Sequence, residues 1–323
     1  MRETGGGLPR AKSRERRAGA RRVGVAAAGA LALLALPAPA GAAFPGSNGK
    51  IAIEREAGGN TEIFTIDAGG GGKERLTDND IFDAGPSFSA DGDEIVFLSD
   101  RDGNQNDVFR MPANDGDPER QLTVGEQTDQ GPSWAPSGDT VVFESDIATS
   151  ESPEGDYEIY SMGRSGDDVE QLTDNDDFDG SPVVSPNGNK IAFDSSRDGD
   201  NEVFKMDAAG GNERQLTTND DIDEDPDWSP DGDGIAFESD RDDSDEQIFT
   251  MEANGDDQTR LTSRDAEDEN AAYSPNGNKI VFESDRDPET EETEIYTMDS
   301  DGSSERRVTE NDREDADPSW GVR

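Results

Sequence analysis

The 323-residue chain contains neither cysteine nor histidine. Without cysteine it can form no disulfide and has no thiol nucleophile. Without histidine it lacks the base of Ser-His-Asp and Cys-His catalysis and the commonest side-chain ligand of zinc sites. These two absences exclude the most familiar hydrolase mechanisms, and they leave carboxylates as the main reactive or ligating groups.

Apolar residues and positive charges are also scarce. Hydrophobic residues make up 29% of the chain, and 29 lysines and arginines face 77 aspartates and glutamates, a net charge of −48. Such a composition is typical of disordered chains. Here, however, the apolar residues are concentrated in short periodic runs, which indicates a folded all-β domain with an acidic surface. A surface of this sign does not neutralise phosphates, so we expect no nucleic-acid binding.

Residues 1–40 have the pattern of a secretory signal peptide. The segment from Met1 to Arg22 carries eight basic residues, an uncharged run of 14 residues follows, and small residues and prolines come next. A membrane-spanning helix needs roughly 20 apolar residues, so we expect cleavage, with no stable membrane insertion afterwards; an uncleaved N-terminal anchor is the alternative. Removing eight basic and two acidic residues leaves 21 basic and 75 acidic ones, a net charge of −54.

The rest of the chain repeats one unit, which is clearest in residues 223–262. Three short runs alternate apolar and polar residues, as half-buried strands do, and Asp231-Gly232 predicts a tight turn between the first two. Two landmarks recur with the same spacings of 46, 50, 44, 45 and 47 residues. The first is an aromatic position, occupied by Phe88, Trp134, Val184, Trp228, Tyr273 and Trp320. The second is a closing threonine, at Thr77, Thr123, Thr173, Thr217, Thr262 and Thr309.

A period of 40 to 50 residues with four strands per unit is typical of a β-propeller. The landmarks give six innermost strands and six outer triplets, but the first triplet has no innermost strand before it and the last innermost strand has no triplet after it. We therefore predict that residues 41–323 form a six-bladed β-propeller of four-stranded antiparallel blades, closed when the C-terminal strand joins the N-terminal blade.

The repeat resembles the WD-like repeat of the TolB β-propeller family. The resemblance rests on Pro226-Asp-Trp228-Ser-Pro230-Asp231-Gly232, on Ile235-Ala-Phe237-Glu-Ser239-Asp240-Arg241 and on Ile248-Phe249, and it covers roughly residues 44–323. It implies an exported propeller that binds a partner. In TolB a small α/β domain precedes the propeller, and we expect no counterpart here, because only the signal-peptide pattern precedes Phe44. We also expect no hydrolase domain like that of related peptidases, because the sequence contains no Gly-x-Ser-x-Gly motif.

A Ser-Asp-Arg-Asp-Gly-like turn recurs after the second strand of four units. It contains Arg101, Arg197, Arg241 and Arg286. Oxygen-rich turns can coordinate calcium, but these lack the order of an EF-hand loop and each carries a repelling arginine. A turn stabilised by hydrogen bonds and an Asp-Arg pair is the simpler interpretation.

One aspartate lies three residues before the proline position of each unit. The six are Asp83, Asp129, Asp179, Asp223, Asp268 and Asp315. The fold would place them around one mouth of the central channel, where six like charges would attract a cation, calcium being the candidate, or a basic group of a partner. The alternative is that each aspartate caps a turn beside its own strand.

Two functions from different classes remain. The favoured one is a non-enzymatic, extracytoplasmic binding or scaffold protein, secreted or periplasmic and monomeric, which recognises a protein, peptide or cell-envelope ligand without an obligatory cofactor. The alternative is a carbohydrate-active or metal-assisted enzyme that uses propeller carboxylates. Because catalysis needs residues in different roles, carboxylates confined to one or two blades would favour the enzyme.

Overall fold

The computed structural model describes residues 43–323 except 102, 104, 148–155, 243–244, 264–265 and 288–291. The predicted signal peptide lies outside the described residues. In the described part, all regular elements are β-strands, and no helix is long and apolar enough to span a membrane. The described residues form one compact unit.

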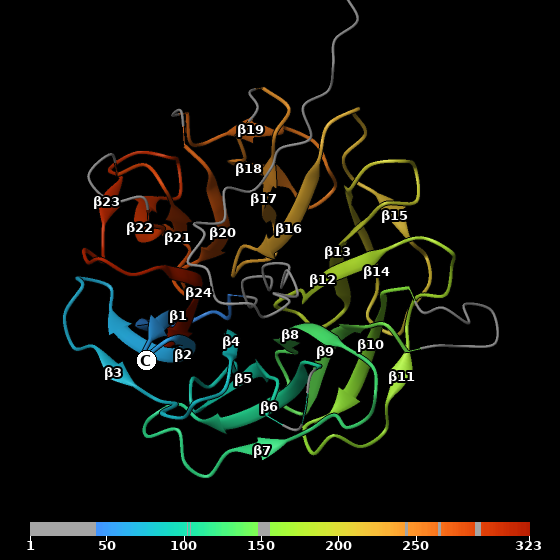
Figure 1. Ribbon diagram of the computed structural model, residues 1–323. Helices are drawn as coiled ribbons and strands as arrows, with labels where there is room; N and C mark the ends of the chain where they lie inside the picture. The colour runs from blue at the N-terminus through green and yellow to red at the C-terminus, as the bar shows by residue number, and fades with distance from the viewer. Residues whose placement is uncertain are drawn as a thin grey trace, which may run out of the picture. The chain divides into compact units, whose positions relative to one another are not determined.

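In the part of the chain that the structure describes, twenty-four strands form six four-stranded antiparallel sheets, which are the blades of a propeller (Figure 1). We number the blades I to VI. Blade I contains β24 (Asp315–Val322), β1 (Asn48–Ala57), β2 (Asn60–Asp67) and β3 (Glu74–Arg75). Blade II contains β4 (Asp83–Phe88), β5 (Glu94–Ser99), β6 (Asp107–Pro112) and β7 (Arg120–Gln121). Blade III contains β8 (Asp129–Trp134), β9 (Thr140–Ser145), β10 (Glu158–Gly163) and β11 (Glu170–Gln171).

The other three blades repeat this plan. Blade IV contains β12 (Asp179–Val184), β13 (Lys190–Ser195), β14 (Glu202–Asp207) and β15 (Arg214–Gln215). Blade V contains β16 (Asp223–Trp228), β17 (Gly234–Ser239), β18 (Gln247–Glu252) and β19 (Thr259–Arg260). Blade VI contains β20 (Asp268–Tyr273), β21 (Lys279–Ser284), β22 (Glu294–Asp299) and β23 (Arg306–Arg307).

The first strand of each blade lies nearest the ring axis, because these strands contact one another from blade to blade all the way round. Burial falls outward: the first two strands are almost fully buried and the fourth is largely exposed. The core lies between neighbouring sheets, where aliphatic and aromatic side chains pack face to face. The low apolar content of the chain is sufficient because each blade needs to bury only its two faces.

The ring is closed as predicted. The C-terminal strand β24 pairs antiparallel with β1, with Trp320 opposite Ile51 and Asp315 opposite Arg55. In Figure 1 the red end of the chain lies beside the blue first blade. The six-bladed, one-plus-three architecture is confirmed, and it leaves no sheet in the ring without its innermost strand.

Candidate functional site

The six predicted aspartates are the first residues of the innermost strands, and none has exposed surface. Five of them pair with an arginine inside their own blade. In blade II, Arg101 Nη2 donates to Asp83 Oδ1 at 2.7 Å. The corresponding pairs are Arg197–Asp179, Arg241–Asp223, Arg286–Asp268 and Arg55–Asp315. The four predicted turn arginines therefore bind four of the predicted aspartates, and Arg55 of β1 binds a fifth, so five of the six charges are neutralised where they lie.

The turn arginines also stack on aromatic side chains. In blade II the guanidinium carbon lies 4.5 Å from the Phe109 ring centroid, and Arg101 Nε donates to Ser99 Oγ at 2.9 Å. This arrangement recurs with Arg197, Arg241 and Arg286. Asn79 adds a further donor to Asp83 at 2.7 Å, and three other blades have the same asparagine. The geometry of these five carboxylates therefore supports the alternative interpretation, in which each aspartate binds groups inside its own blade.

Every innermost strand carries a β-bulge at its third residue. The register with the second strand shifts there, and the residue has a positive φ between 46° and 58° in all six blades. These bulge residues are Gly85, Gly131, Ser181, Asp225, Asn270 and Asp317. Glycine, asparagine and aspartate are the residues that adopt this conformation most readily. The bulge frees one backbone amide per blade from the sheet.

The freed amides bind a second set of carboxylates, which the sequence analysis missed. On the second strands of five blades lie Glu54, Glu144, Asp194, Glu238 and Glu283, whereas blade II has Leu98. We call these five residues the carboxylate belt. Each of four belt residues accepts the bulge amide of the next blade, as when Ser181 N donates to Glu144 at 3.0 Å and Asp317 N to Glu283 at 2.7 Å. The belt therefore joins neighbouring blades close to the inner strands.

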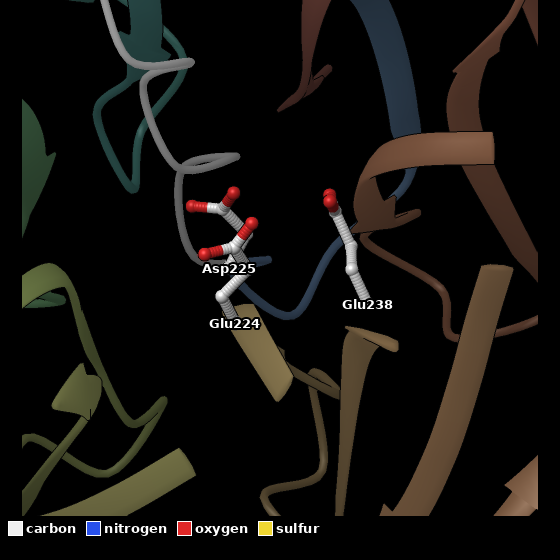
Figure 2. Close-up of side chains that lie close together, drawn as sticks. All are labelled: Glu224, Asp225 and Glu238. Carbon is white, nitrogen blue, oxygen red and sulfur yellow. The ribbon is translucent and has the colours of Figure 1, made fainter. Parts of the chain in front are cut away.

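The belt becomes a dense acidic cluster in blades V and VI, which we define as Glu224, Asp225, Glu238, Glu246 and Glu269. Carboxylate oxygens of Glu224, Asp225 and Glu238 lie within 4.8 Å of one another, and so do those of Glu238, Glu246 and Glu269. Figure 2 shows Glu224 and Asp225 side by side, with Glu238 opposite them. Successive strand residues normally point to opposite faces. The left-handed Asp225 breaks that alternation, so two neighbouring carboxylates share one side.

Two members of the cluster, Asp225 and Glu238, are buried, whereas Glu224, Glu246 and Glu269 are partly exposed. Asp225 and Glu238 are 4% and 1% exposed, and in the part of the chain that the structure describes neither forms an ion pair. Burial raises the pKa of both well above the usual range, and the nearby Glu224 and Asp225 carboxylates respectively raise it further. Glu224 also lies directly opposite Glu238 in the sheet, a like-charge pairing that destabilises the sheet.

Burial also raises the pKa of other carboxylates in and beside the belt. Burial raises the pKa of Glu144 and of Glu283 to about 8, and the hydrogen bond from the neighbouring bulge amide only partly offsets it. The pKa of Asp194 and of Asp317 is raised well above the usual range, again chiefly by burial. Asp194 Oδ1 and Asp317 Oδ1 are buried without a hydrogen-bond partner among the described residues. These buried carboxylates can therefore bind protons, hydrogen-bond donors or a cation.

One signal in the sequence could have pointed to this cluster. A glutamate or aspartate precedes the serine that ends the second strand in four blades, at Glu144, Asp194, Glu238 and Glu283, and an acidic Glu224 or Glu269 follows the first aspartate in two blades. Only the pairing of Glu224 with Glu238 and of Glu269 with Glu283 brings these positions together. The sequence pattern alone does not distinguish them from the many exposed acidic residues.

Comparisons with known proteins agree with the architecture. The family model described as the TolB beta propeller domain matches residues 36–147, 144–244 and 222–323. TolB from Acinetobacter baumannii is similar at a TM-score of 0.73 and 21% identity, covering 87% of this chain and 68% of that one. A putative TolB from Agrobacterium tumefaciens is similar at 0.66 and 21%, covering 80% and 88%. An oligogalacturonate lyase in complex with manganese is similar at 0.56 and 15%, covering 84% and 78%. At these identities the structural likeness shows the fold alone.

Proposed function

The chain belongs to the TolB beta propeller domain family, and we propose that it is an exported, non-enzymatic binding protein of the extracytoplasmic space. It recognises a protein, a peptide or a cell-envelope ligand, and the acidic cluster of blades V and VI is its binding site. The observation that carries this proposal is the group of carboxylate oxygens of Glu224, Asp225 and Glu238 within 4.8 Å of one another. The basic, then apolar leader of residues 1–40 supports export.

Asp225 and Glu238 are buried and form no ion pair within the described residues. Buried ionised carboxylates without a countercharge are strongly unfavourable, so such a group takes up protons or a cation. A ligand that brings a positive charge relieves this cost, and its binding then stabilises the fold by mass action. We place the ligand here and not at the six aspartates of the inner strands, because an arginine already neutralises five of those.

Two ligands satisfy the cluster: a lysine or arginine of a partner protein, and a divalent cation. Calcium prefers six to eight oxygen ligands, and the cluster offers carboxylate oxygens only. Calcium bound here would be a structural ion or a bridge to the partner. Asp194 and Asp317, which have buried oxygens without partners, lie on the blades that flank the cluster.

The decisive experiment compares the domain of residues 41–323 with two variants. Glu238→Gln and Asp225→Asn remove charge but keep shape, and asparagine tolerates the positive φ of 49° at residue 225. The wild type immobilised on beads should retain a partner from the envelope fraction, and both variants should lose it. Asp301→Asn, at an exposed turn, is the matched control and should retain the partner. If the two cluster variants retain the partner fully, the site lies elsewhere.

Calcium is tested separately by thermal unfolding of metal-free protein. Calcium should raise the melting temperature beyond sodium chloride of equal ionic strength, and Glu238→Gln should abolish the excess while Asp301→Asn keeps it. If the excess survives in Glu238→Gln, the ion binds at another site.

The confinement of the cluster to two blades favours one second candidate, a metal-assisted enzyme acting on acidic oligosaccharides. An oligogalacturonate lyase with manganese shares the fold. Incubation with oligogalacturonate and manganese should then generate unsaturated products that absorb in the ultraviolet, and Glu238→Gln should abolish them. If the wild type generates no such product, this candidate fails and the binding function is unaffected.

A further inference from the structure

Four blades hold an arginine in a socket of identical construction. Its walls are two aromatic rings whose centroids lie 5.7–5.9 Å apart, and its floor is formed by a buried aspartate and a serine hydroxyl. In blade VI, for example, Arg286 Nη2 donates to Asp268 Oδ1 at 2.6 Å and Nε donates to Ser284 Oγ at 2.8 Å. The guanidinium carbon lies 4.7–4.9 Å from the two ring centroids. These four copies define the chemical group that the socket binds.

Blade III has the same walls and floor but no arginine. The rings of Phe143 and Tyr160 lie 5.8 Å apart at 28°, as in blade VI. Ser145 Oγ donates to Asp129 Oδ1 at 2.5 Å, as Ser284 does to Asp268. Asp129 has no exposed surface, and its Oδ2 has no hydrogen-bond partner among the described residues. We call Asp129, Phe143, Ser145 and Tyr160 the blade III socket.

Three substitutions in the repeat explain why this socket has no internal ligand. Ile147 takes the position of the turn arginine, and it is too short and apolar to bind Asp129. Gly125 takes the position of the asparagine that donates to the aspartate in four other blades. Val169, half exposed, takes the position of Glu119, Glu213 and Glu305, which pair with the turn arginines of their blades. Residues 148–155 contain no lysine or arginine either.

We propose that the blade III socket binds an arginine side chain of a partner protein or peptide, in the pose that the turn arginines adopt in blades II, IV, V and VI. The guanidinium stacks on Phe143 and Tyr160, one Nη donates to Asp129, and Nε donates to Ser145. The aliphatic part of the arginine then takes the place of the Ile147 side chain, which packs against the core cluster that contains Phe143 and Tyr160, and lies beside the half-exposed Val169. This site is distinct from the acidic cluster of blades V and VI.

The four sockets that hold an arginine indicate how a ligand reaches the blade III socket and why it would bind arginine in preference to lysine. The side chains of the four turn arginines are 6–23% exposed, so the outer end of the socket lies near the surface of the blade. In blade III, Phe143 and Tyr160 are 1% and 4% exposed, so a side chain that now covers them moves aside when the guanidinium enters. The planar fork of arginine can stack and bind Asp129 at the same time, whereas lysine presents a single point charge. The net charge of −48 attracts basic partners to the molecule as a whole.

The test uses three blocked peptides, acetyl-Gly-X-Gly-amide with X arginine, lysine or citrulline, titrated into the whole chain by calorimetry and by NMR of aromatic carbons. The arginine peptide should bind and shift the Tyr160 signals, and the lysine peptide and the uncharged citrulline peptide should bind at least about tenfold more weakly. Equal binding of all three would overturn the proposal. Binding of arginine and lysine alike, without a shift at Tyr160, would mean general attraction to the acidic surface and would overturn it too.

Three variants locate the site. Asp129→Asn should weaken arginine binding at least about tenfold. Ile147→Arg supplies the arginine internally, as in four other blades, and should abolish binding while the melting temperature stays or rises. Asp301→Asn, at an exposed turn outside both sites, is the control and should bind the peptide as the wild type does. If Ile147→Arg is folded and binds the peptide fully, the socket is not the site.

A gain-of-function variant keeps the test decisive if Ile147→Arg does not fold. Val169→Glu restores the second carboxylate that pairs with the arginine in blades II, IV and VI. It should tighten binding of the arginine peptide about two- to fivefold, the gain expected of a partly exposed ion pair. The affinity for citrulline should not change. Unchanged affinity for the arginine peptide would contradict the proposed pose.

Discussion

At the scale of single residues, the chain handles its buried carboxylates in two ways. The inner-strand aspartates of five blades each have an arginine, so their charge is compensated inside the protein. The belt residues are bound by backbone amides and uncharged side chains such as those of Ser181 and Asn270, and burial raises their pKa. The first arrangement holds a blade together, and the second leaves a need for protons or a ligand.

The first arrangement predicts a large loss of stability when its arginine is removed. Arg241→Ala leaves Asp223 buried without its guanidinium and removes the stacking on Phe237 and Phe249. We expect the free energy of unfolding to fall by about 3–5 kcal/mol, as measured in chemical denaturation. The double variant Asp223→Asn/Arg241→Met should lose less, because it leaves no unpaired buried charge. An Arg241→Ala protein as stable as the wild type would contradict the structural role of the pair.

The second arrangement predicts that stability falls as pH rises. Glu144 and Glu283 have an ordinary pKa of 4.5 and a folded pKa of about 8. Above pH 4.5 the unfolded chain loses these protons while the folded protein keeps them, so the free energy of unfolding decreases from about pH 4.5 to about pH 8. The melting temperature in a chelating buffer should therefore be higher at pH 5 than at pH 8.

The variant Glu144→Gln checks the assignment. It is neutral at every pH, so its melting temperature should decline less between pH 5 and pH 8 than that of the wild type. A decline as steep as that of the wild type would show that other groups cause the pH dependence.

At the scale of elements, the repeat landmarks were sufficient for the strands but not for the site. The apolar–polar alternation and the turn residues predict four strands per blade, because both are local properties of the sequence. The recurring aromatic position (Trp228) and closing threonine (Thr262) predict the closure of the ring by the C-terminal strand. Asp223 and Arg241 were identified separately, but the pairing of β16 with β17 that brings them together is a long-range contact. The bulge was missed because glycine, serine, asparagine and aspartate all occupy its position.

The bulge conformation predicts the effect of substitutions at Ser181, which has a φ of 50° and whose backbone N–H donates a hydrogen bond to Glu144. A β-branched side chain is strained in this conformation, whereas glycine adopts it freely. Ser181→Val should lower the free energy of unfolding by about 1–3 kcal/mol. Ser181→Gly keeps the bulge and loses only the hydroxyl bond to Asp225, so it should lose less. If valine and glycine have the same effect, the positive φ is not what the position requires.

At the scale of the whole molecule, stability depends on closing the ring. Each blade is sandwiched between two others, so a missing strand exposes faces and edges of its neighbours. The clasp strand β24 supplies Trp320, which is 3% exposed, and Asp315, which pairs with Arg55 of β1. Asp317, also on β24, joins the belt through Glu283 of blade VI. This one eight-residue strand therefore completes the sheet of blade I and also joins it to blade VI.

Deleting residues 315–323 should consequently destabilise the entire propeller. Loss of the buried Trp320 side chain alone corresponds to about 3–5 kcal/mol, a large share of the stability of a typical domain.

A gentler variant is Gly49→Ala, because a Cβ at residue 49 would lie 2.4 Å from the carbonyl oxygen of Val322 and push β24 away from β1. Gly103→Ala is not a suitable control, since its φ of 146° is itself unfavourable for alanine. Gly69→Ala is suitable, because nothing lies within 4 Å of a Cβ there and its φ is not positive. The melting temperature should fall most for the deletion, less for Gly49→Ala and least for Gly69→Ala. A deletion variant that melts with the wild type would show that the ring does not need its clasp.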